Sequence, residues 1–371
     1  MTPTGPASAL RVLVIADDGL RRSQLLRVLQ RNADIAVVGQ ATGAAGVVDL
    51  LAQTDTDVVI LDLDLCDGSG QAAVEEIMSR APRPILVLST AVERADGPSA
   101  ALAAGAVAVV PVPPQWTTEA GADLRHTTHQ VSKVHVVRHA RGGQPRAAAR
   151  IAAAAPGLGA TTRPPGQASG RTPPQATPSH DVPSRPVVGL AASTGGPAAL
   201  AIVLAGLAGL AAPVLVVQHL HADFTNGLIE WMSRASSLPV AAAVHGQAAR
   251  PGWVYLAPAG VHLRLGAAGR LELTAIPVSL HCPSADQLFL SMSERAGRDG
   301  VGVVLTGMGD DGAAGLLALR RQGGRTLGQD EESCAVFGMP HAAQLAGAVT
   351  NLLPLSQVAP AIQRAVSEVL R

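Results

Sequence analysis

The chain has 371 residues, a formal net charge of zero and only 2% aromatic residues. This length is enough for two ordinary domains, each with its own core. Zero net charge argues against a nucleic-acid surface, and the scarcity of aromatic rings argues against a groove that stacks bases or sugars. The three cysteines lie far apart and predict neither a disulfide framework nor a metal cluster, as is usual in a reducing cytoplasm.

No segment predicts export or membrane insertion. The amino terminus lacks the basic patch and apolar run of a signal peptide. Residues 198–217 carry no charge over about the length that spans a bilayer, but Pro213 interrupts them. A helix packed on a sheet, followed by a buried strand, explains the same residues. We therefore expect a cytoplasmic protein with no membrane insertion.

Apolar runs alternate with amphipathic segments from Leu10 onward, which is typical of a parallel sheet covered by helices. Acidic residues follow two of the expected strands: Asp17 and Asp18 follow the first, and Asp62 follows the third. Because the carboxyl ends of parallel strands meet at one edge of the sheet, these carboxylates predict a Mg²⁺ site there. The expected strands cover residues 11–16, 34–39, 58–61, 85–88 and 107–110.

This half of the chain, residues 9–140, resembles the receiver domain of two-component response regulators. In that resemblance Asp62, within "VVILDLD", takes the phosphoacceptor position. The resemblance implies a flavodoxin-like fold, Mg²⁺ held by the acid pair, and a chemotaxis histidine kinase as partner. Two positions depart from the family: Ala16 stands in the first acidic position unless the register slips by one residue, and Val112 stands where a lysine is expected. The only lysine in the chain is Lys133.

Residues 141–184 are rich in Pro, Gly, Ala and Arg and have almost no acidic residues. Such a composition cannot bury a core and predicts a flexible linker. The helix before it is expected to end near Ala140 and carries several histidines. Because no cysteine or acid joins them at ligand spacing, we expect a solvated face and not a metal site. These histidines are His126, His129, His135 and His139.

Alternation of strands and helices resumes in residues 185–371, which predicts a second doubly wound α/β domain, Rossmann-like in type. The stretch "VHLRLGAAGRLELTAI" alternates polar and apolar residues around a glycine turn and predicts an antiparallel hairpin. The expected strands cover residues 187–191, 214–218, 253–257, 301–305 and 325–328.

The stretch "VVGLAASTGGP" at the start of this domain predicts a buried strand, a tight turn and a helix start. The turn presents the hydroxyl of Ser193, followed by the backbone amides of Thr194, Gly195 and Gly196. Two functions fit such a turn: an activated serine with amides that stabilise an anion, or a phosphate cradle.

Two further strand ends carry reactive side chains. His219 follows the second strand of this domain, and Asp310 and Asp311 follow a later one. In a parallel sheet these ends share one rim with Ser193. A serine needs a base to remove its proton, and an imidazole needs a carboxylate to fix its tautomer. The three positions therefore predict a Ser-His-Asp hydrolytic site.

An alternative uses the same residues. The sequence "GMGDDG" at 307–312 matches the dinucleotide fingerprint G-x-G-x-x-G, with Asp330 about twenty residues further on. Two adjacent carboxylates would repel a pyrophosphate, and the motif comes late in the domain and not after its first strand. A dinucleotide-binding protein is therefore the weaker alternative.

The second domain resembles the catalytic domain of chemotaxis protein-glutamate methylesterases over nearly its full length. The matching stretches are "ASTGGP", "VVQH", "YLAP", "GVGVVLTGMGDDGAAG" and "ESCAVFGMP". The resemblance implies that Ser193 is the nucleophile, His219 the general base and acid, and Asp311 the orienting carboxylate. It also implies that the Met308 amide stabilises the oxyanion and that Thr194 supports the imidazole.

The implied reaction is hydrolysis of glutamate γ-methyl esters on the cytoplasmic domains of methylated chemoreceptors, without a catalytic cofactor. Glutamine deamidation is a second implied activity, and the glycines at 195 and 196 would leave room for the substrate carbonyl. Two runs depart from the family near the site, "HLHADF" after the second strand and "HCPS" at 281–284, and they bear on the choice of receptor. A competing function is a signalling or binding module whose esterase site is vestigial.

Overall fold

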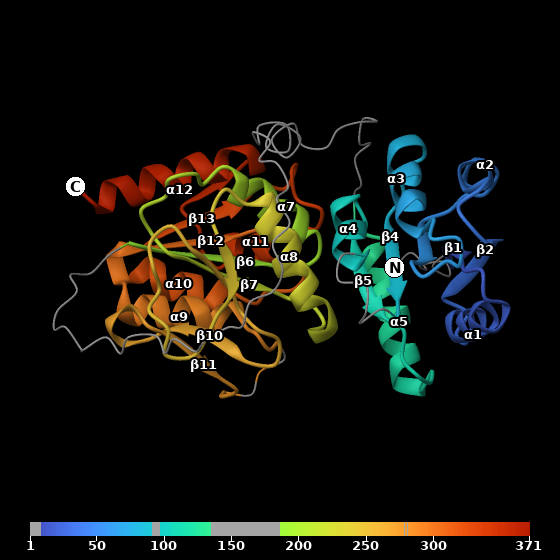
Figure 1. Cartoon of the computed structure of the whole chain (residues 1–371), viewed down its shortest axis with the longest axis horizontal. Coiled ribbons are helices and arrows are strands. Elements are labelled where there is room, and N and C mark those ends of the chain that lie inside the picture. The colour runs from blue at the N-terminus through green and yellow to red at the C-terminus, as the bar shows by residue number, and fades with distance from the viewer. Residues whose placement is uncertain (1–8, 91–96, 135–185, 278, 280) are drawn as a thin grey trace, which may run out of the picture.

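The computed structural model describes residues 9–90, 97–134, 186–277, 279 and 281–371. The expected linker, 141–184, and two of the histidines, His135 and His139, lie outside these ranges. The described residues form two layered α/β units, one on each side of Figure 1. Among them, no helix combines the length and the apolar character needed to cross a bilayer.

The first unit is a five-stranded parallel sheet with the strand order β2-β1-β3-β4-β5. This is the flavodoxin-like order, as expected, with its switch point between β1 and β3. The strands are β1 (Leu10–Ile15), β2 (Ile35–Ala41), β3 (Val58–Asp62), β4 (Ile85–Ser89) and β5 (Ala108–Pro111). The helices are α1 (Gly19–Leu29), α2 (Val47–Gln53), α3 (Gly70–Arg80), α4 (Gly97–Ala103) and α5 (Thr118–Val131).

The apolar runs of β3 and β4 follow from burial on both faces of the sheet. In β3, Val59 and Leu61 pack into one apolar cluster, while Val58 and Ile60 pack into the cluster on the opposite face. A strand covered by helices on both sides has no exposed face, so it needs no polar alternation. This is why these strands could be recognised from short unbroken apolar runs.

The helix α5 is shorter than predicted. It ends at Val131 and not near Ala140. The hydroxyl of Ser132 donates to the carbonyl of His129 at 2.8 Å, and such local side-chain bonds compete with continuation of a helix. The expected single long helix is therefore wrong at its carboxyl end.

The second unit is a seven-stranded parallel sheet with the strand order β14-β13-β12-β6-β7-β9-β8. Its strands are β6 (Val187–Ala192), β7 (Val214–Gln218), β8 (Val240–Ala242), β9 (Val254–Leu256), β12 (Gly300–Val304), β13 (Arg325–Gln329) and β14 (Asn351–Leu353). The predicted hairpin is confirmed as an antiparallel pair, β10 (His262–Leu265) with β11 (Leu271–Thr274), and it forms a separate two-stranded sheet.

Helices cover both faces of this sheet. One apolar cluster joins it to α7 (Gly196–Ala205), α8 (Thr225–Ala235) and α12 (Leu355–Val369). The other joins it to α9 (Ala285–Arg295), α10 (Ala313–Arg321), α11 (Met339–Leu345) and the β10–β11 pair. The described residues of this unit also form the short 3₁₀ turns η1 (Ala222–Phe224), η2 (Ala267–Gly269) and η3 (Gly297–Asp299). Strand β6 lies at the centre between β12 and β7, so the residues after these three strands meet at one rim.

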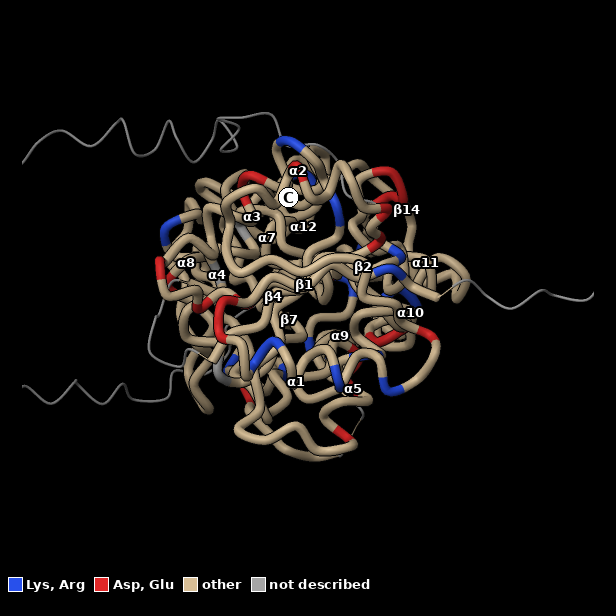
Figure 2. The backbone as a smooth tube through the Cα atoms, turned by 90° about the vertical axis from the view of Figure 1, so that its right-hand side faces the viewer, with Lys and Arg blue, Asp and Glu red and all other residues tan. Residues whose placement is uncertain are grey.

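The two units contact each other beside that rim. Helix α4 of the first unit packs against α7 and α8 of the second (Figure 1). Leu220 and the buried Phe224 join an apolar cluster of the first unit, and Ala335 and Val336 pack against its other cluster. In the view of Figure 2, Lys and Arg are interspersed with Asp and Glu, and neither sign covers the face shown.

Candidate active site

Ser193 lies in a tight turn between β6 and α7. Its amide donates to the carbonyl of Thr306 at 3.1 Å, and its carbonyl accepts from the amide of Gly196 at 2.8 Å. Gly195, at φ 75°, has the left-handed conformation that favours glycine. The predicted strand, turn and helix start are confirmed. However, the Gly196 amide is used inside the turn, so it is not directed at a ligand as expected.

Gln218, the last residue of β7, connects the backbones of the predicted nucleophile and base. Its Nε2 donates to the carbonyl of Ser193 at 2.8 Å and to that of His219 at 3.0 Å. A Cβ on Gly196 would come within 2.0 Å of its Oε1, so only glycine fits there. The sequence analysis did not single out this residue, although a glutamine at the end of a buried apolar strand was a signal for it.

His219 lies beside the serine turn and is bonded to Asp311. Its amide donates to the carbonyl of Ala192 at 3.0 Å, which places it next to the end of β6. Its Nε2 lies 2.8 Å from Oδ2 of Asp311, and the two side chains are only 12% and 7% exposed. In the described part of the chain the Ser193 hydroxyl makes no hydrogen bond to this ring. The Nδ1 atom is the ring nitrogen left for it, and such bonds often form only with substrate bound.

The carboxylate of Asp311 is held at the amino terminus of α9. A helix amino terminus favours a negative charge. Burial by itself would raise the pKa of Asp311, but the hydrogen bonds from His219 and from α9 outweigh it and lower the pKa to about 2. Asp311 is therefore ionised and can stabilise an imidazolium. The donors at this helix end are Oγ of the capping residue Ser284 at 2.8 Å, the amide of Ala285 at 2.7 Å and the amide of Asp286 at 3.0 Å.

Met308 follows Gly307, whose backbone is hydrogen-bonded and lies close to Ser193. The amide of Gly307 donates to Val336 at 3.1 Å, and its carbonyl accepts from Met339 at 2.8 Å. A Cβ on Gly307 would lie 2.8 Å from the Cβ of Ser193. Among the described residues the Met308 amide has no hydrogen-bond partner. Its donation to an oxyanion formed at Ser193 stays a prediction.

Two other expectations concern neighbouring residues. The carbonyl of Thr194 accepts from Thr306 Oγ1 at 3.0 Å, and support of the imidazole by the Thr194 side chain stays a prediction. Within "GMGDDG", the carboxylate of Asp311 is bonded to His219 and to α9. The carboxylate of Asp311 is therefore directed at groups of the protein itself, as the predicted Ser-His-Asp site requires.

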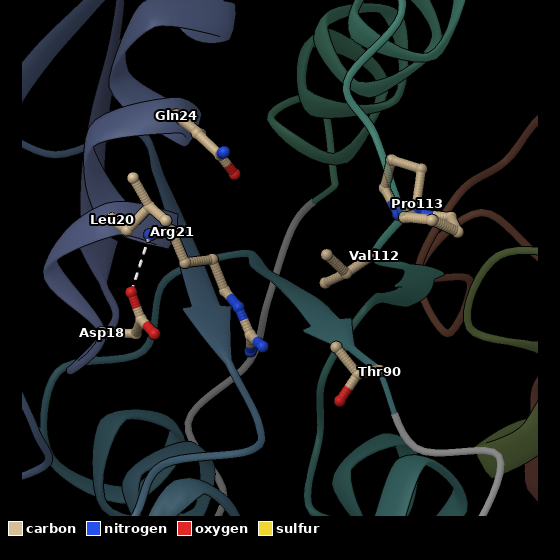
Figure 3. Close-up of a pocket in the computed structure, with 8 residues that line it drawn as sticks. Asp18, Leu20, Arg21, Gln24, Thr90, Val112 and Pro113 are labelled. Atoms are coloured by element: carbon tan, nitrogen blue, oxygen red, sulfur yellow. Dashed lines mark hydrogen bonds between the residues drawn. The ribbon is translucent and has the colours of Figure 1, made fainter.

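The first unit has its own polar site at the end of β3. Asp62 is fully buried, and its Oδ2 lies 2.6 Å from Nη1 of Arg21. Burial raises the pKa of Asp62, and the ion pair with Arg21 only partly offsets this. Figure 3 shows Arg21 extending from α1 toward Thr90 and Val112. These three residues line a cavity of about 460 Å³.

The predicted magnesium ligands do not gather around Asp62. Asp17 accepts from the amides of Asp18 and Cys66, and Asp18 caps α1 by accepting from the amide of Arg21 at 2.9 Å. Among the described residues, no group of three His, Cys, Asp or Glu side chains could hold a metal ion. The cation beside Asp62 is the guanidinium, so this arrangement does not fit the Mg²⁺ expected at Asp17 and Asp18.

Comparison with known proteins matches both units. Residues 188–362 match the family model described as CheB methylesterase, and residues 12–114 match the response regulator receiver domain. A protein of Anaeromyxobacter dehalogenans named protein-glutamate methylesterase/protein-glutamine glutaminase 3 is 38% identical over 358 residues, which cover 94% of this chain and 97% of that protein. A relative of the same function name from Agrobacterium fabrum is 38% identical over 355 residues and 94% of each chain. The crystal structure of the Thermotoga maritima CheB methylesterase catalytic domain is 32% identical, with a TM-score of 0.47, and covers 49% of this chain and 98% of that one.

Proposed function

Because the chain belongs to the family of CheB-type protein-glutamate methylesterases that carry a receiver domain, we propose that it hydrolyses glutamate γ-methyl esters on chemoreceptors. The hydrogen bond of 2.8 Å between His219 and Asp311, beside the turn of Ser193, carries this proposal. A base with a fixed carboxylate next to a serine hydroxyl is what acyl transfer through a serine requires.

The residues have distinct parts in the reaction. Ser193 Oγ attacks the ester carbonyl while Nδ1 of His219 takes its proton, and the Met308 amide donates to the oxyanion. His219 then gives the proton to the departing methoxide, which leaves as methanol. Water attacks the acyl-enzyme with His219 again as base, and glutamate is released as Ser193 regains its proton. With a glutamine side chain the same steps release ammonia, which is deamidation.

This proposal implies particular partners and a location. The substrates are the cytoplasmic domains of methylated chemoreceptors, so we place the protein in the cytoplasm. A chemotaxis histidine kinase would act on the receiver at Asp62. A phosphoryl group there would face the guanidinium of Arg21, since Val112 offers no charge at the position where the family has a lysine.

The test is methanol release from methylated receptor membranes. We expect Ser193→Ala and His219→Ala each to abolish it while the melting temperature stays near that of the native chain. The matched controls are Ser367→Ala and His245→Ala, which alter exposed residues outside the site. Substantial activity in either site variant would contradict the assignment. A native chain that binds receptors but releases neither methanol nor ammonia would favour the vestigial binding module.

A further inference from the structure

The stretch that leads into α9 contacts both partners of the catalytic hydrogen bond. Ser284 donates to the Asp311 carboxylate at 2.8 Å. Three residues earlier, the ring of His281 stacks on the ring of His219, with centroids 4.5 Å apart and planes inclined by 12°. One short segment therefore holds the carboxylate and covers one face of the imidazole.

This stretch is fixed to the rest of the domain by His262, a fully buried residue of β10. Its Nδ1 accepts from the amide of Ser284 at 3.1 Å, and its Nε2 donates to the carbonyl of Pro277 at 2.8 Å. The neutral tautomer with its proton on Nε2 satisfies both bonds. His262 thus anchors positions on both sides of His281, and the stacked ring has a firm support.

A hydrogen bond and a ring stack constrain an imidazole in different ways. The bond to Asp311 fixes the position of Nε2 on His219, but the ring could still tilt about that contact. A parallel ring at 4.5 Å restricts the tilt and keeps water from that face. We propose that His281 is a positioning residue that sets the plane of His219 so that Nδ1 is presented to Ser193. This inference rests on the proposed function of His219 as general base.

The charge of His281 supports this role. The titratable groups that act on it are His219, Asp310 and Asp311. Burial, and then the charge of His219, lower the pKa of His281, against the opposite effect of the two carboxylates. The lowered pKa favours the neutral form of His281 while His219 accepts the serine proton. A neutral ring over an imidazolium face is favourable, whereas a second imidazolium would repel it.

The test uses the full chain with three substitutions. We expect His281→Ala to lower kcat for methanol release by about 10- to 100-fold with little change in KM, because misplaced catalytic groups cost rate more than binding. We expect His281→Phe, which retains a stacked ring, to stay within about threefold of the native kcat. The control His245→Ala changes an exposed histidine outside the site and should leave kcat unchanged. Native kcat in His281→Ala, with the control also native, would overturn the proposal.

A readout without turnover keeps this inference separate from the proposed activity. The stacked ring shifts the proton resonances of the His219 ring upfield, and His281→Ala should remove that shift while His281→Phe retains one. If the native chain hydrolysed no ester but showed this pattern, the proposed function would fail and the positioning contact would stand. If the ester were hydrolysed and the shift were absent, only the inference about His281 would fail.

Discussion

The guanidinium of Arg21 lies 2.6 Å from the carboxylate of Asp62, whose side chain has no exposed surface. The pair joins α1 to the end of β3, at the carboxylate for which the sequence predicts phosphorylation. Val112, on the β5 side of this site, cannot supply the charge that a lysine would bring. The guanidinium of Arg21 instead approaches Asp62 from α1, which follows β1, and not from the β5 side.

Removal of Arg21 should therefore destabilise the receiver. We expect Arg21→Met to lower the free energy of unfolding by about 3 kcal/mol near neutral pH, because it leaves a buried carboxylate without its partner. Since burial raises the pKa of Asp62, the loss should shrink as the pH falls and Asp62 becomes protonated. Urea denaturation measures both effects.

The control for this experiment is Arg27→Met, which changes an exposed arginine on the same helix. Adding Asp62→Asn to Arg21→Met should recover most of the loss, since the second change removes the buried charge. A loss in Arg21→Met no larger than in Arg27→Met would show that the ion pair contributes nothing to stability.

Asp311 should make the stability of the catalytic domain depend on pH at the acid end. Its pKa is lowered from 3.8 to about 2 in the folded protein. A carboxyl group with a lowered folded pKa stabilises the fold above its unfolded pKa, and this contribution is lost as the pH falls through the folded pKa. We expect about 2 kcal/mol to be lost between about pH 4 and pH 2.

Asp311→Asn should remove that part of the dependence, as measured by urea denaturation from pH 2 to pH 6. Glu332→Gln, at an exposed acidic residue, serves as the control and should leave the curve unchanged. The same curve for Asp311→Asn and the native protein would contradict the assignment of the lowered pKa to this carboxyl group.

Gly196→Ala should damage the site without altering a reactive group. The new methyl carbon would lie 2.0 Å from Gln218 Oε1 and 2.8 Å from the Cβ of Ala192, so Gln218 must move away from the two carbonyls that it holds. We expect a loss of about 1 to 3 kcal/mol in stability and a fall in kcat. In the control Gly43→Ala the new carbon meets no atom closer than 3.9 Å. A native kcat in Gly196→Ala would mean that the bonds of Gln218 to the carbonyls of Ser193 and His219 do not matter for the rate.

In the full chain, the receiver domain should slow ester hydrolysis by the catalytic domain. Leu220 directly follows His219, and together with Phe224 it packs into an apolar cluster of the receiver. Ala335 and Val336, which contact the receiver from the other side, lie against the loop that carries Met308. We expect a fragment that begins near Arg185 to release methanol faster than the full chain, provided that circular dichroism shows it folded. Equal rates would leave the receiver without a gating role.

Most of the strands could be predicted from the sequence because the sheets are buried on both faces. Such strands appear as unbroken apolar runs, and their order along the chain alternates with helices. The strands that were missed, β8 and β14, have only three residues each. The end of α5 was missed because it depends on a local bond of Ser132 and not on periodicity.

The candidate site divides in the same way. Ser193, His219 and Asp311 could be predicted because each follows a strand of one parallel sheet, and the topology alone brings strand ends together. The stacking of His281 on His219 could not be predicted. His281 follows no strand of the sheet, and the two rings are far apart in the sequence and meet only in the folded chain. Arg21 could not be predicted either, since a long side chain on a helix can reach in several directions.

We expect the pairing of β12 with β6 to limit when this enzyme can first act during its synthesis. Gly300 pairs with Val187, and Asp311 comes still later in the chain than the serine that it serves. A ribosome-bound chain that has already made Ser193 and His219 would therefore lack both the carboxylate and the central strand neighbour. Contacts between such distant residues form slowly. Recovery of ester hydrolysis during refolding should consequently follow the closure of the sheet and lag behind the formation of its helices.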